Sequence, residues 1–134
     1  LIKKPITKTN KIWEYFTTGR PARRGLIYNE NLIKNTQKIF FCDNKKLIAL
    51  DANTGKELSN FGDKGVVILK KRCQITPIIF KEKLIIATFE PALEIYDLIS
   101  GKLLWKYYLS VLLELVKNFH AQQSLSSYRR LHED

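Results

Sequence analysis

Two stretches of the sequence decide the fold: Lys38-IFFCDNKKLIALDANTGKELSN-Phe61 and Leu84-IIATFEPALEIYDLISGKLLWK-Tyr107. They match without gaps at an offset of 46 residues, the separation between Asp51 and Asp97. Repeats of roughly 40–50 residues are typical of β-propeller blades. The chain is therefore expected to contain a repeated β unit.

The repeat extends backwards to the beginning of the chain. Two periods before Trp105 lies Trp13, so residues 11–16 predict the tail of an earlier blade. Within each copy, short β-branched and aromatic runs alternate with turn residues, which predicts an antiparallel meander. The fold class is all-β, with blades at about 36–61 and 75–108. The predicted strands are Ile39–Cys42, Leu47–Leu50, Thr76–Phe80, Leu84–Phe89 and Leu93–Tyr96.

The repeated Asp and Gly have a structural explanation. Asp51 and Asp97 are expected to begin turns, where a carboxylate can accept bonds from backbone N–H groups. Gly55 and Gly101 can adopt the positive φ that such turns require. The leucine three residues after each glycine would begin the next strand. Trp105 would then pack against a neighbouring blade.

The composition is globular and basic. The chain has 134 residues and a formal net charge of +10, which suits one small domain and excludes a complete propeller. Residues 1–46 hold 11 basic and 3 acidic side chains, a net of +8. Such a surface could attract nucleic acid, but the lysines are scattered, so we predict no nucleic-acid partner. The sequence contains no Met, which predicts a processed chain or a fragment.

The cysteines and histidines of the sequence form no pattern typical of a metal site or a catalytic triad. Cys42 and Cys73 are 31 residues apart, a spacing that fits no zinc motif. They form either a disulfide in an oxidising compartment or two buried thiols. His120 and His132 stand alone, so the sequence predicts neither a metal site nor a catalytic triad.

The repeats resemble those of the pyrroloquinoline-quinone (PQQ) dependent dehydrogenases of the glucose and alcohol dehydrogenase type, which are eight-bladed β-propellers. The stretch Ile95–Trp105 is similar to their tryptophan-docking motif, and Ala49–Ser59 keeps all of it but the Trp. Pro21-Ala-Arg-Arg-Gly-Leu-Ile-Tyr28 resembles their Arg-Gly-x-x-Tyr segment, and Phe61-Gly-Asp-Lys-Gly65-Val resembles an insertion in sugar-oxidising members. The likeness covers residues 11–109, so we assign 1–109 to a partial PQQ-type propeller.

The resemblance implies two cofactor-binding residues. Arg24 matches an arginine that contacts a PQQ carboxylate, which a guanidinium can hold through two parallel bonds. Thr76 matches a threonine that hydrogen-bonds a PQQ carboxylate. The alternatives are an ordinary turn arginine and a threonine that merely opens a strand. Glu90 lies near a calcium-binding glutamate of the family but out of register, so no metal ligand is assigned, and the catalytic aspartate has no counterpart.

The resemblance also implies a function. The parent protein would be periplasmic, in some cases anchored in the inner membrane, and would oxidise a sugar or alcohol hydroxyl with PQQ and calcium. A quinone or cytochrome would accept the electrons, and this chain alone would be inactive. The alternative is a non-catalytic PQQ-repeat propeller that acts as a binding or assembly scaffold, because such proteins carry the same repeats.

Residues 110–134 differ from the family pattern. Leu112, Leu115, Val116 and Phe119 follow helical spacing, and the segment contains neither Gly nor Pro, which predicts a helix. The helix either covers an exposed blade edge or results from loss of the reading frame near Leu109. The abrupt end of the resemblance favours the second interpretation, a tail that is not family sequence.

Overall fold

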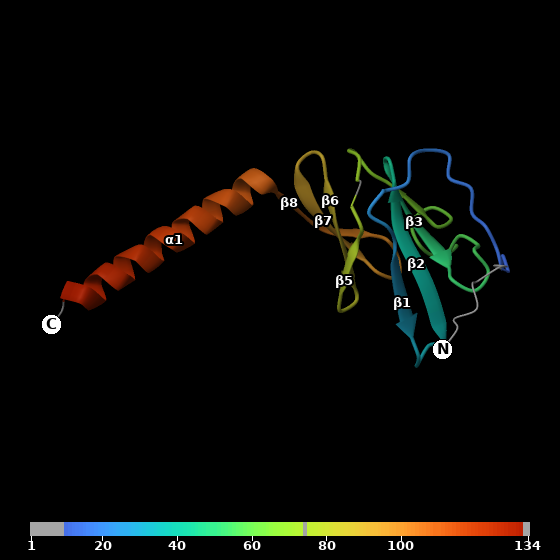
Figure 1. Ribbon diagram of the computed structural model, residues 1–134, viewed down its shortest axis with the longest axis horizontal. Helices are drawn as coiled ribbons and strands as arrows, with labels where there is room; N and C mark the ends of the chain where they lie inside the picture. Colours follow the sequence, from blue (N-terminus) through green and yellow to red (C-terminus); the bar gives the residue numbers. More distant parts are fainter. Residues whose placement is uncertain (1–9, 74, 133–134) are drawn as a thin grey trace, which may run out of the picture.

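The strands form two antiparallel sheets of four strands each, with the strands of each sheet in sequential order (Figure 1). The computed structural model describes residues 10–73 and 75–132. One helix follows the second sheet. The elements are β1 (Ile27–Asn31), β2 (Thr36–Asp43), β3 (Lys46–Asp51), β4 (Val66–Ile68), β5 (Ile78–Phe80), β6 (Lys83–Thr88), β7 (Ala92–Asp97), β8 (Leu103–Tyr108) and α1 (Leu109–His132).

The five predicted strands are confirmed as β2, β3, β5, β6 and β7, and each sheet has the meander order expected of a blade. The first sheet is wider than the predicted 36–61, because β1 precedes it and β4 follows it. The strand expected to start at Leu58 starts at Val66 instead. Leu58 makes one backbone bond to Ala49, and the chain then turns so that Phe61 is buried.

The two sheets share one hydrophobic core. From the first sheet, alternate residues of β2 and β3 point toward the second sheet, as period-two alternation requires. From the second sheet, alternate residues of β6 and β7 point back. Burying such side chains in contact is the main stabilising term of the blade pair. The buried residues of this core are Phe40, Cys42, Leu47, Ala49, Phe61, Leu69, Cys73, Leu84, Ile86, Tyr96 and Leu98.

Each blade has a turn that receives an aromatic ring. Gly55 and Gly101 both have φ of 70°, and each lies against a ring from the preceding part of the chain. A Cβ on Gly55 would lie 2.4 Å from the ring of Trp13, whose indole N–H donates to the Ala52 carbonyl at 2.9 Å. A Cβ on Gly101 would lie 3.2 Å from the Phe61 ring. Trp13 therefore contacts the first blade at its Gly55 turn, while the assignment of residues 11–16 to an earlier blade stays a prediction.

The aspartates of these turns act as predicted. Asp51 accepts hydrogen bonds from the backbone N–H groups of Asn53 and Thr54, both at 2.9 Å. Asp97 accepts from the backbone N–H and the hydroxyl of Ser100, both at 2.7 Å. These two bonds, the hydroxyl bond first, lower the pKa of Asp97.

Trp105 is the repeat equivalent of Trp13 but lies on the outer face of the second sheet. Cross-strand pairing places Ile78, Ile85, Ile95 and Trp105 in one row on that face. The Trp105 side chain is 50% exposed, and the ammonium of Lys83 lies 5.7 Å from its ring centroid. The second sheet thus presents an apolar face that the rest of the described chain leaves uncovered.

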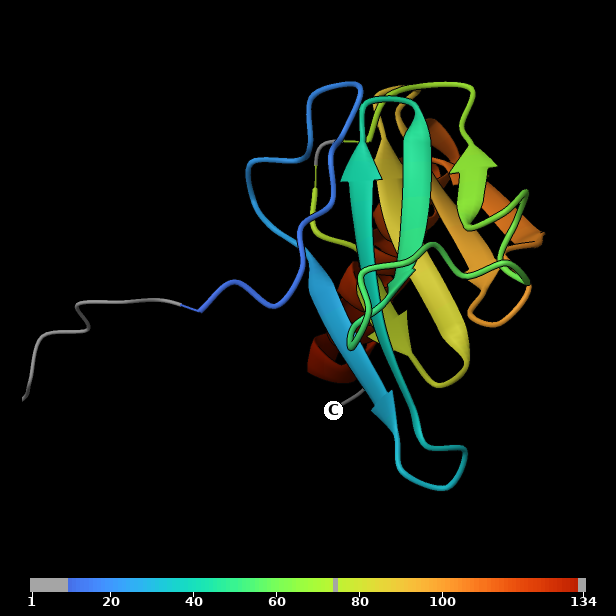
Figure 2. The ribbon, with the colours of Figure 1, turned by 90° about the vertical axis from the view of Figure 1, so that its right-hand side faces the viewer.

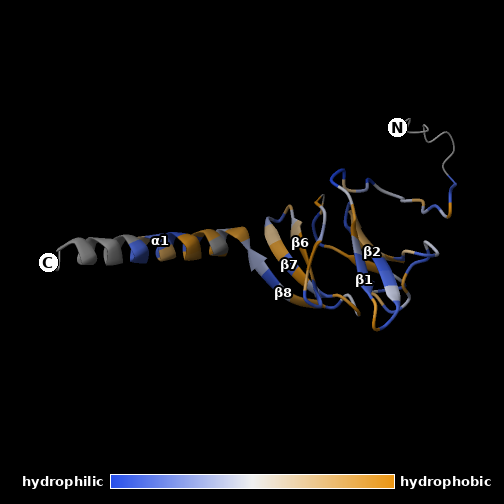
Figure 3. Cartoon of the chain, turned by 60° about the horizontal axis from the view of Figure 1, so that its bottom comes forward, coloured by the Kyte–Doolittle hydropathy of each residue, from blue (hydrophilic) through white to orange (hydrophobic). Residues whose placement is uncertain are grey.

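The predicted C-terminal helix is confirmed as α1, but it covers no blade edge. It continues directly from β8 and extends away from both sheets (Figures 1 and 3). Val111, Leu113, Leu115, Val116 and Phe119 are each at least half exposed; the side chain of Leu112 lies outside the described residues. No helix in the described ranges combines the length and the apolarity that a membrane crossing needs.

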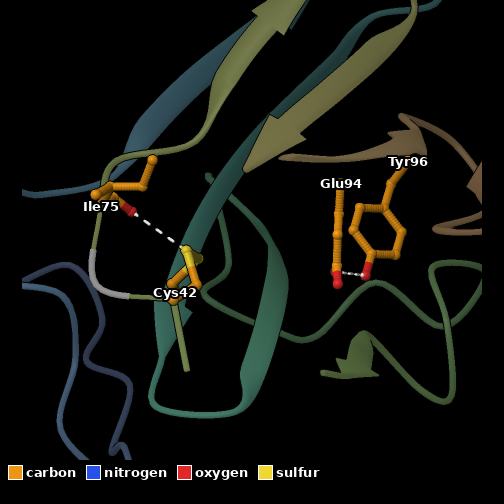
Figure 4. The surroundings of a disulfide bond; sticks show 5 residues. Cys42, Ile75, Glu94 and Tyr96 are labelled. Carbon is orange, nitrogen blue, oxygen red and sulfur yellow. Dashed lines mark hydrogen bonds between the residues drawn. A yellow bond between two sulfur atoms is a disulfide. The ribbon is translucent and has the colours of Figure 1, made fainter. Parts of the chain in front are cut away.

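Cys42 and Cys73 form a disulfide, the first of the two alternatives (Figure 4). Both residues are fully buried and their Cα atoms are 5.7 Å apart. The bond joins the end of β2 to the segment that leads into β5. It therefore links the two blades covalently at the end opposite the Gly55 and Gly101 turns.

Candidate functional site

Arg24 and Thr76, the two cofactor-binding residues implied by the resemblance, lie at one end of the blade pair. The loop 17–25, the β2–β3 turn and the described residues of the connection between the blades, 69–73 and 75–77, meet there (Figure 2). Backbone bonds join them: Ala22 donates to the Cys42 carbonyl at 2.8 Å, and Cys73 donates to the Asn44 carbonyl at 3.0 Å. The segments form one continuous surface that spans both blades.

The structure brings Arg24 and Thr76 together across 52 residues of sequence. The Thr76 hydroxyl donates a hydrogen bond to the backbone carbonyl of Arg24 at 2.7 Å. A hydroxyl has one proton to donate, so this bond uses the donor that a cofactor carboxylate would need. The Arg24 guanidinium, in contrast, is exposed. The two assigned roles remain predictions.

Three arginines converge on a polar pocket beside this bond. Arg20, Arg23 and Arg24, together with Pro21, line a volume of about 340 Å³. All ion pairs of the described residues involve lysine, so none of these guanidinium groups has a carboxylate partner there. Sequence reasoning singled out Arg24 alone. The missed signal was three of the chain's six arginines within five positions, in a chain that otherwise uses lysine.

The loop that carries these arginines is held in place by hydrogen bonds to residues of the β2–β3 hairpin. The Gly19 N–H donates to a carboxylate oxygen of Asp43 at 3.2 Å, and the ammonium of Lys46 donates to the Thr18 hydroxyl at 3.0 Å. Asp43 is buried, and its Oδ1 has no hydrogen-bond partner within the described part of the chain. A buried carboxylate beneath the loop adds negative charge below the arginine cluster and offsets part of its repulsion.

An apolar pocket adjoins the arginine pocket and shares Pro21 with it. Its volume is about 240 Å³. Tyr15 lies at its wall, where its hydroxyl donates to Glu57 at 2.6 Å. Burial, with this bond and the charges of Glu57 and Asp43, raises the pKa of Tyr15 to about 12. The lining residues are Trp13, Tyr15, Thr17, Pro21, Ala22, Leu26, Ile39, Phe41 and Leu50.

A second charged cluster lies on the inner side of the second sheet. Lys106 forms ion pairs with Glu90 and with the buried Glu94, which also accepts a bond from the Tyr96 hydroxyl (Figure 4). The bond from Lys106 lowers the pKa of Glu90, and burial first, then the bond to Glu94, raises the pKa of Tyr96. Within the described ranges, no three His, Cys, Asp or Glu side chains are placed to hold a metal ion.

These residues fit the implied cofactor in part. The Arg24 guanidinium, with Arg20 and Arg23 beside it, suits a carboxylate such as those of PQQ. Thr76 does not fit as a donor, because its proton is already shared with the Arg24 carbonyl. Glu90 faces the Lys106 ammonium, which occupies the position that a cation would take beside it.

Comparison with known proteins places the chain in a family. The family model for the glucose/ethanol/alcohol dehydrogenase β-propeller domain (PQQ) matches residues 6–123, which extends past position 109 into α1. No curated protein matches the chain.

Among solved structures, the chain is similar to the crystal structure of BamB from Moraxella catarrhalis, with a TM-score of 0.56 and 24% sequence identity. The match covers 74% of this chain and 28% of that one, so this chain spans little more than a quarter of that propeller. The two sheets are therefore blades of a β-propeller. Because the family model covers most of its length, the chain belongs to the PQQ family of glucose/ethanol/alcohol dehydrogenase β-propeller domains.

Proposed function

We propose that this blade pair is part of a non-catalytic PQQ-repeat propeller that acts as a binding or assembly scaffold. One observation carries the proposal: the Thr76 hydroxyl donates to the Arg24 carbonyl. The residue pair that would hold a cofactor carboxylate in a dehydrogenase is used here to connect the two blades. The repeat motif is likewise used for packing, with Trp13 on the Gly55 turn and Phe61 on the Gly101 turn.

The outer face of the second sheet supports the same proposal. By the repeat, Leu93 and Ile95 on that face correspond to Leu47 and Ala49, which pack against the second blade. A face built in this way suits a further blade. We propose an oxidising compartment such as the periplasm, since the Cys42–Cys73 disulfide persists in such an environment.

PQQ binding tests this function. Titration of the chain with PQQ and Ca²⁺ is expected to give no saturable binding, and a sugar or an alcohol is expected to give no dye reduction. Thr76→Val should lower the denaturant midpoint, because it removes the bond between the blades, with no effect on PQQ. Saturable PQQ binding that Arg24→Ala and Thr76→Val both abolish would overturn the scaffold function.

A second candidate is part of a PQQ-dependent dehydrogenase, and the arginine pocket favours it. When bound, PQQ supplies the two-electron acceptor for the oxidation of an alcohol or sugar hydroxyl. This chain's contribution would be to orient the cofactor through Arg24, with Arg20 and Arg23 neutralising its other carboxylates. Calcium, the substrate and the electron acceptor would be held by other parts of the parent.

A further inference from the structure

We infer that the arginine pocket and the apolar pocket beside it form one binding site for an acidic peptide segment of a partner protein, with an apolar side chain next to its carboxylates. The inference rests on the proposed scaffold function and names the partner chemistry of that scaffold. The arginine pocket would receive the carboxylates, and the apolar pocket would receive the neighbouring side chain. Pro21 lines both pockets, so one short segment can reach the two of them.

The choice of arginine points to carboxylates. A guanidinium offers a planar set of donors that matches a carboxylate through two parallel bonds, whereas a lysine ammonium is a point charge. Three arginines line a volume of about 340 Å³, and none of them forms an ion pair with an acidic residue of the described chain. Three unpaired cations held together repel one another, and bound carboxylates remove that repulsion.

The loop is ordered before any ligand arrives. Its backbone is bonded to Cys42 and to Asp43, and Lys46 bonds its Thr18. Asp43 lies under the loop and is buried, so it does not compete for the arginines from the ligand's side. Since less loop entropy is lost on binding, more of the interaction energy appears as affinity.

The surrounding surface would attract an acidic partner. The β2–β3 turn and residues 70–72 add five cations at the same end. Of the acids near the two pockets, Asp43 is buried, Glu90 pairs with Lys106, and Glu57 accepts the bond from the Tyr15 hydroxyl at the wall of the apolar pocket. Such one-sided charge raises the association rate of an oppositely charged partner.

The apolar pocket decides between macromolecule classes. In a membrane the apolar acyl chains lie behind the headgroups, and in a duplex the bases are stacked inside the helix. A peptide, in contrast, can present a carboxylate and an apolar side chain next to each other at its surface. Trp13, Leu26 and Phe41 offer such a side chain an apolar wall within about 240 Å³. The paired pockets therefore favour a protein segment over an RNA, a DNA or a membrane surface.

Binding of a labelled peptide to the full chain tests the site. The probe is a fluorescein-labelled Glu-Asp-Phe-Glu-Asp peptide, read by anisotropy, with a matched peptide that has Ala in place of Phe. The variant Arg20→Gln/Arg23→Gln/Arg24→Gln removes the pocket charges, and Lys45→Gln/Lys70→Gln/Lys71→Gln removes the same charge outside the pocket. We expect the arginine variant to weaken binding at least ~10-fold, the worth of one charge-assisted hydrogen bond. The lysine variant should weaken it less than ~3-fold, as expected for screened surface charges.

Leu26→Ala tests the apolar half. Leu26 is exposed and lines the apolar pocket, so its truncation should weaken the Phe peptide and leave the Ala peptide unchanged. Circular dichroism of all variants should match that of the wild type, because the substituted arginines and lysines are exposed and form no ion pairs in the described chain, and Leu26 is exposed as well.

The other outcomes are informative. If the arginine and lysine variants lose the same fold of peptide affinity, the site is overturned, because the peptide then binds to the overall positive charge of the surface and not to the arginine pocket. Tighter binding of single-stranded DNA or of phosphatidylglycerol vesicles would overturn it in favour of those ligands. If neither the peptide nor PQQ binds, the site fails and the scaffold function stands. If PQQ saturates the pocket and supports dye reduction, the scaffold function itself fails.

Discussion

The Asp51–Gly55 and Asp97–Gly101 turns share their sequence motif and backbone but receive different rings. The first receives Trp13, which is half-buried and hydrogen-bonded to the turn. The second receives Phe61, which has no exposed surface and belongs to the core between the sheets. Ser59 stands at the tryptophan position of the middle repeat. The comparison teaches that the repeat conserves the receiving turn more strictly than the ring that docks on it.

The largest expected effect comes from removing the second ring. Phe61→Ala should lower the free energy of unfolding by about 3–5 kcal/mol, the usual cost of truncating a buried aromatic side chain. Trp13→Ala should cost less, about 1–2 kcal/mol, because its ring is only partly buried. Urea unfolding followed by circular dichroism measures both. Phe16→Ala, at a largely exposed ring, is the control, and equal costs for Phe61 and Trp13 would contradict the comparison.

Removing the disulfide tests how much the covalent link adds to the packing of the two blades. Cys42→Ser/Cys73→Ser should cost about 2–4 kcal/mol, since the disulfide closes a loop of roughly 30 residues in the unfolded chain. Combined with Phe61→Ala, the losses should add, because the two features lie at opposite ends of the blade pair. The readout is again the urea transition. A wild type whose stability does not change under reducing conditions would contradict this.

The turns themselves should respond differently to a single methyl group. Gly101→Ala should cost about 2–3 kcal/mol, because the new Cβ meets the Gly62 backbone nitrogen at 2.9 Å in addition to the cost of a positive φ. Gly55→Ala should cost about 1 kcal/mol, since the atoms nearest to the new Cβ belong to the Trp13 ring, which can move away. Tryptophan fluorescence should show the release of Trp13 in the Gly55 variant alone. Ser59→Ala, at an exposed position, is the control.

The smallest effect is a pH dependence. Hydrogen bonds from Ser100 lower the pKa of Asp97 below that of the unfolded chain, about 3.9. The stabilisation is therefore complete above the unfolded value and is lost as the pH falls through the folded one. Between pH 7 and pH 3 the urea midpoint of the wild type should fall further than that of Asp97→Asn. Parallel curves for the two proteins would show that Asp97 contributes nothing.

The sequence was sufficient to predict those elements that depend on interactions between residues close together in the chain. The Asp and Gly turns depend on bonds within four residues, so their pattern was sufficient. The helix over 109–132 followed from its spacing in the same way. β1 was missed because only its first two residues, Ile27 and Tyr28, favour a strand, whereas the Asn, Glu and Asn that follow are residue types depleted in strands. The start of β4 was misplaced because burial of Phe61, a tertiary event, delays the strand by eight residues relative to Leu58.

The site was harder to predict than the fold. Arg24 and Thr76 were expected near one ligand, and they do lie together, but the bond that joins them runs from a hydroxyl to a backbone carbonyl. No sequence pattern states which acceptor a threonine will find across two blades. The arginine pocket likewise needs the loop 17–25 to fold back on the end of β2, and this depends on the buried Asp43.

The unequal settings of the two tryptophans give the molecule its own optical probes. Trp13 is docked, with its indole N–H bonded to Ala52, whereas Trp105 is half exposed beneath the Lys83 ammonium. Iodide should quench the emission of Trp105 first, because the anion is drawn to the lysine and reaches an open ring. A protein or blade that covers the outer face of the second sheet would protect Trp105 from iodide quenching, while the fluorescence of Trp13 would not change. Binding at that face can thus be followed without attaching a dye.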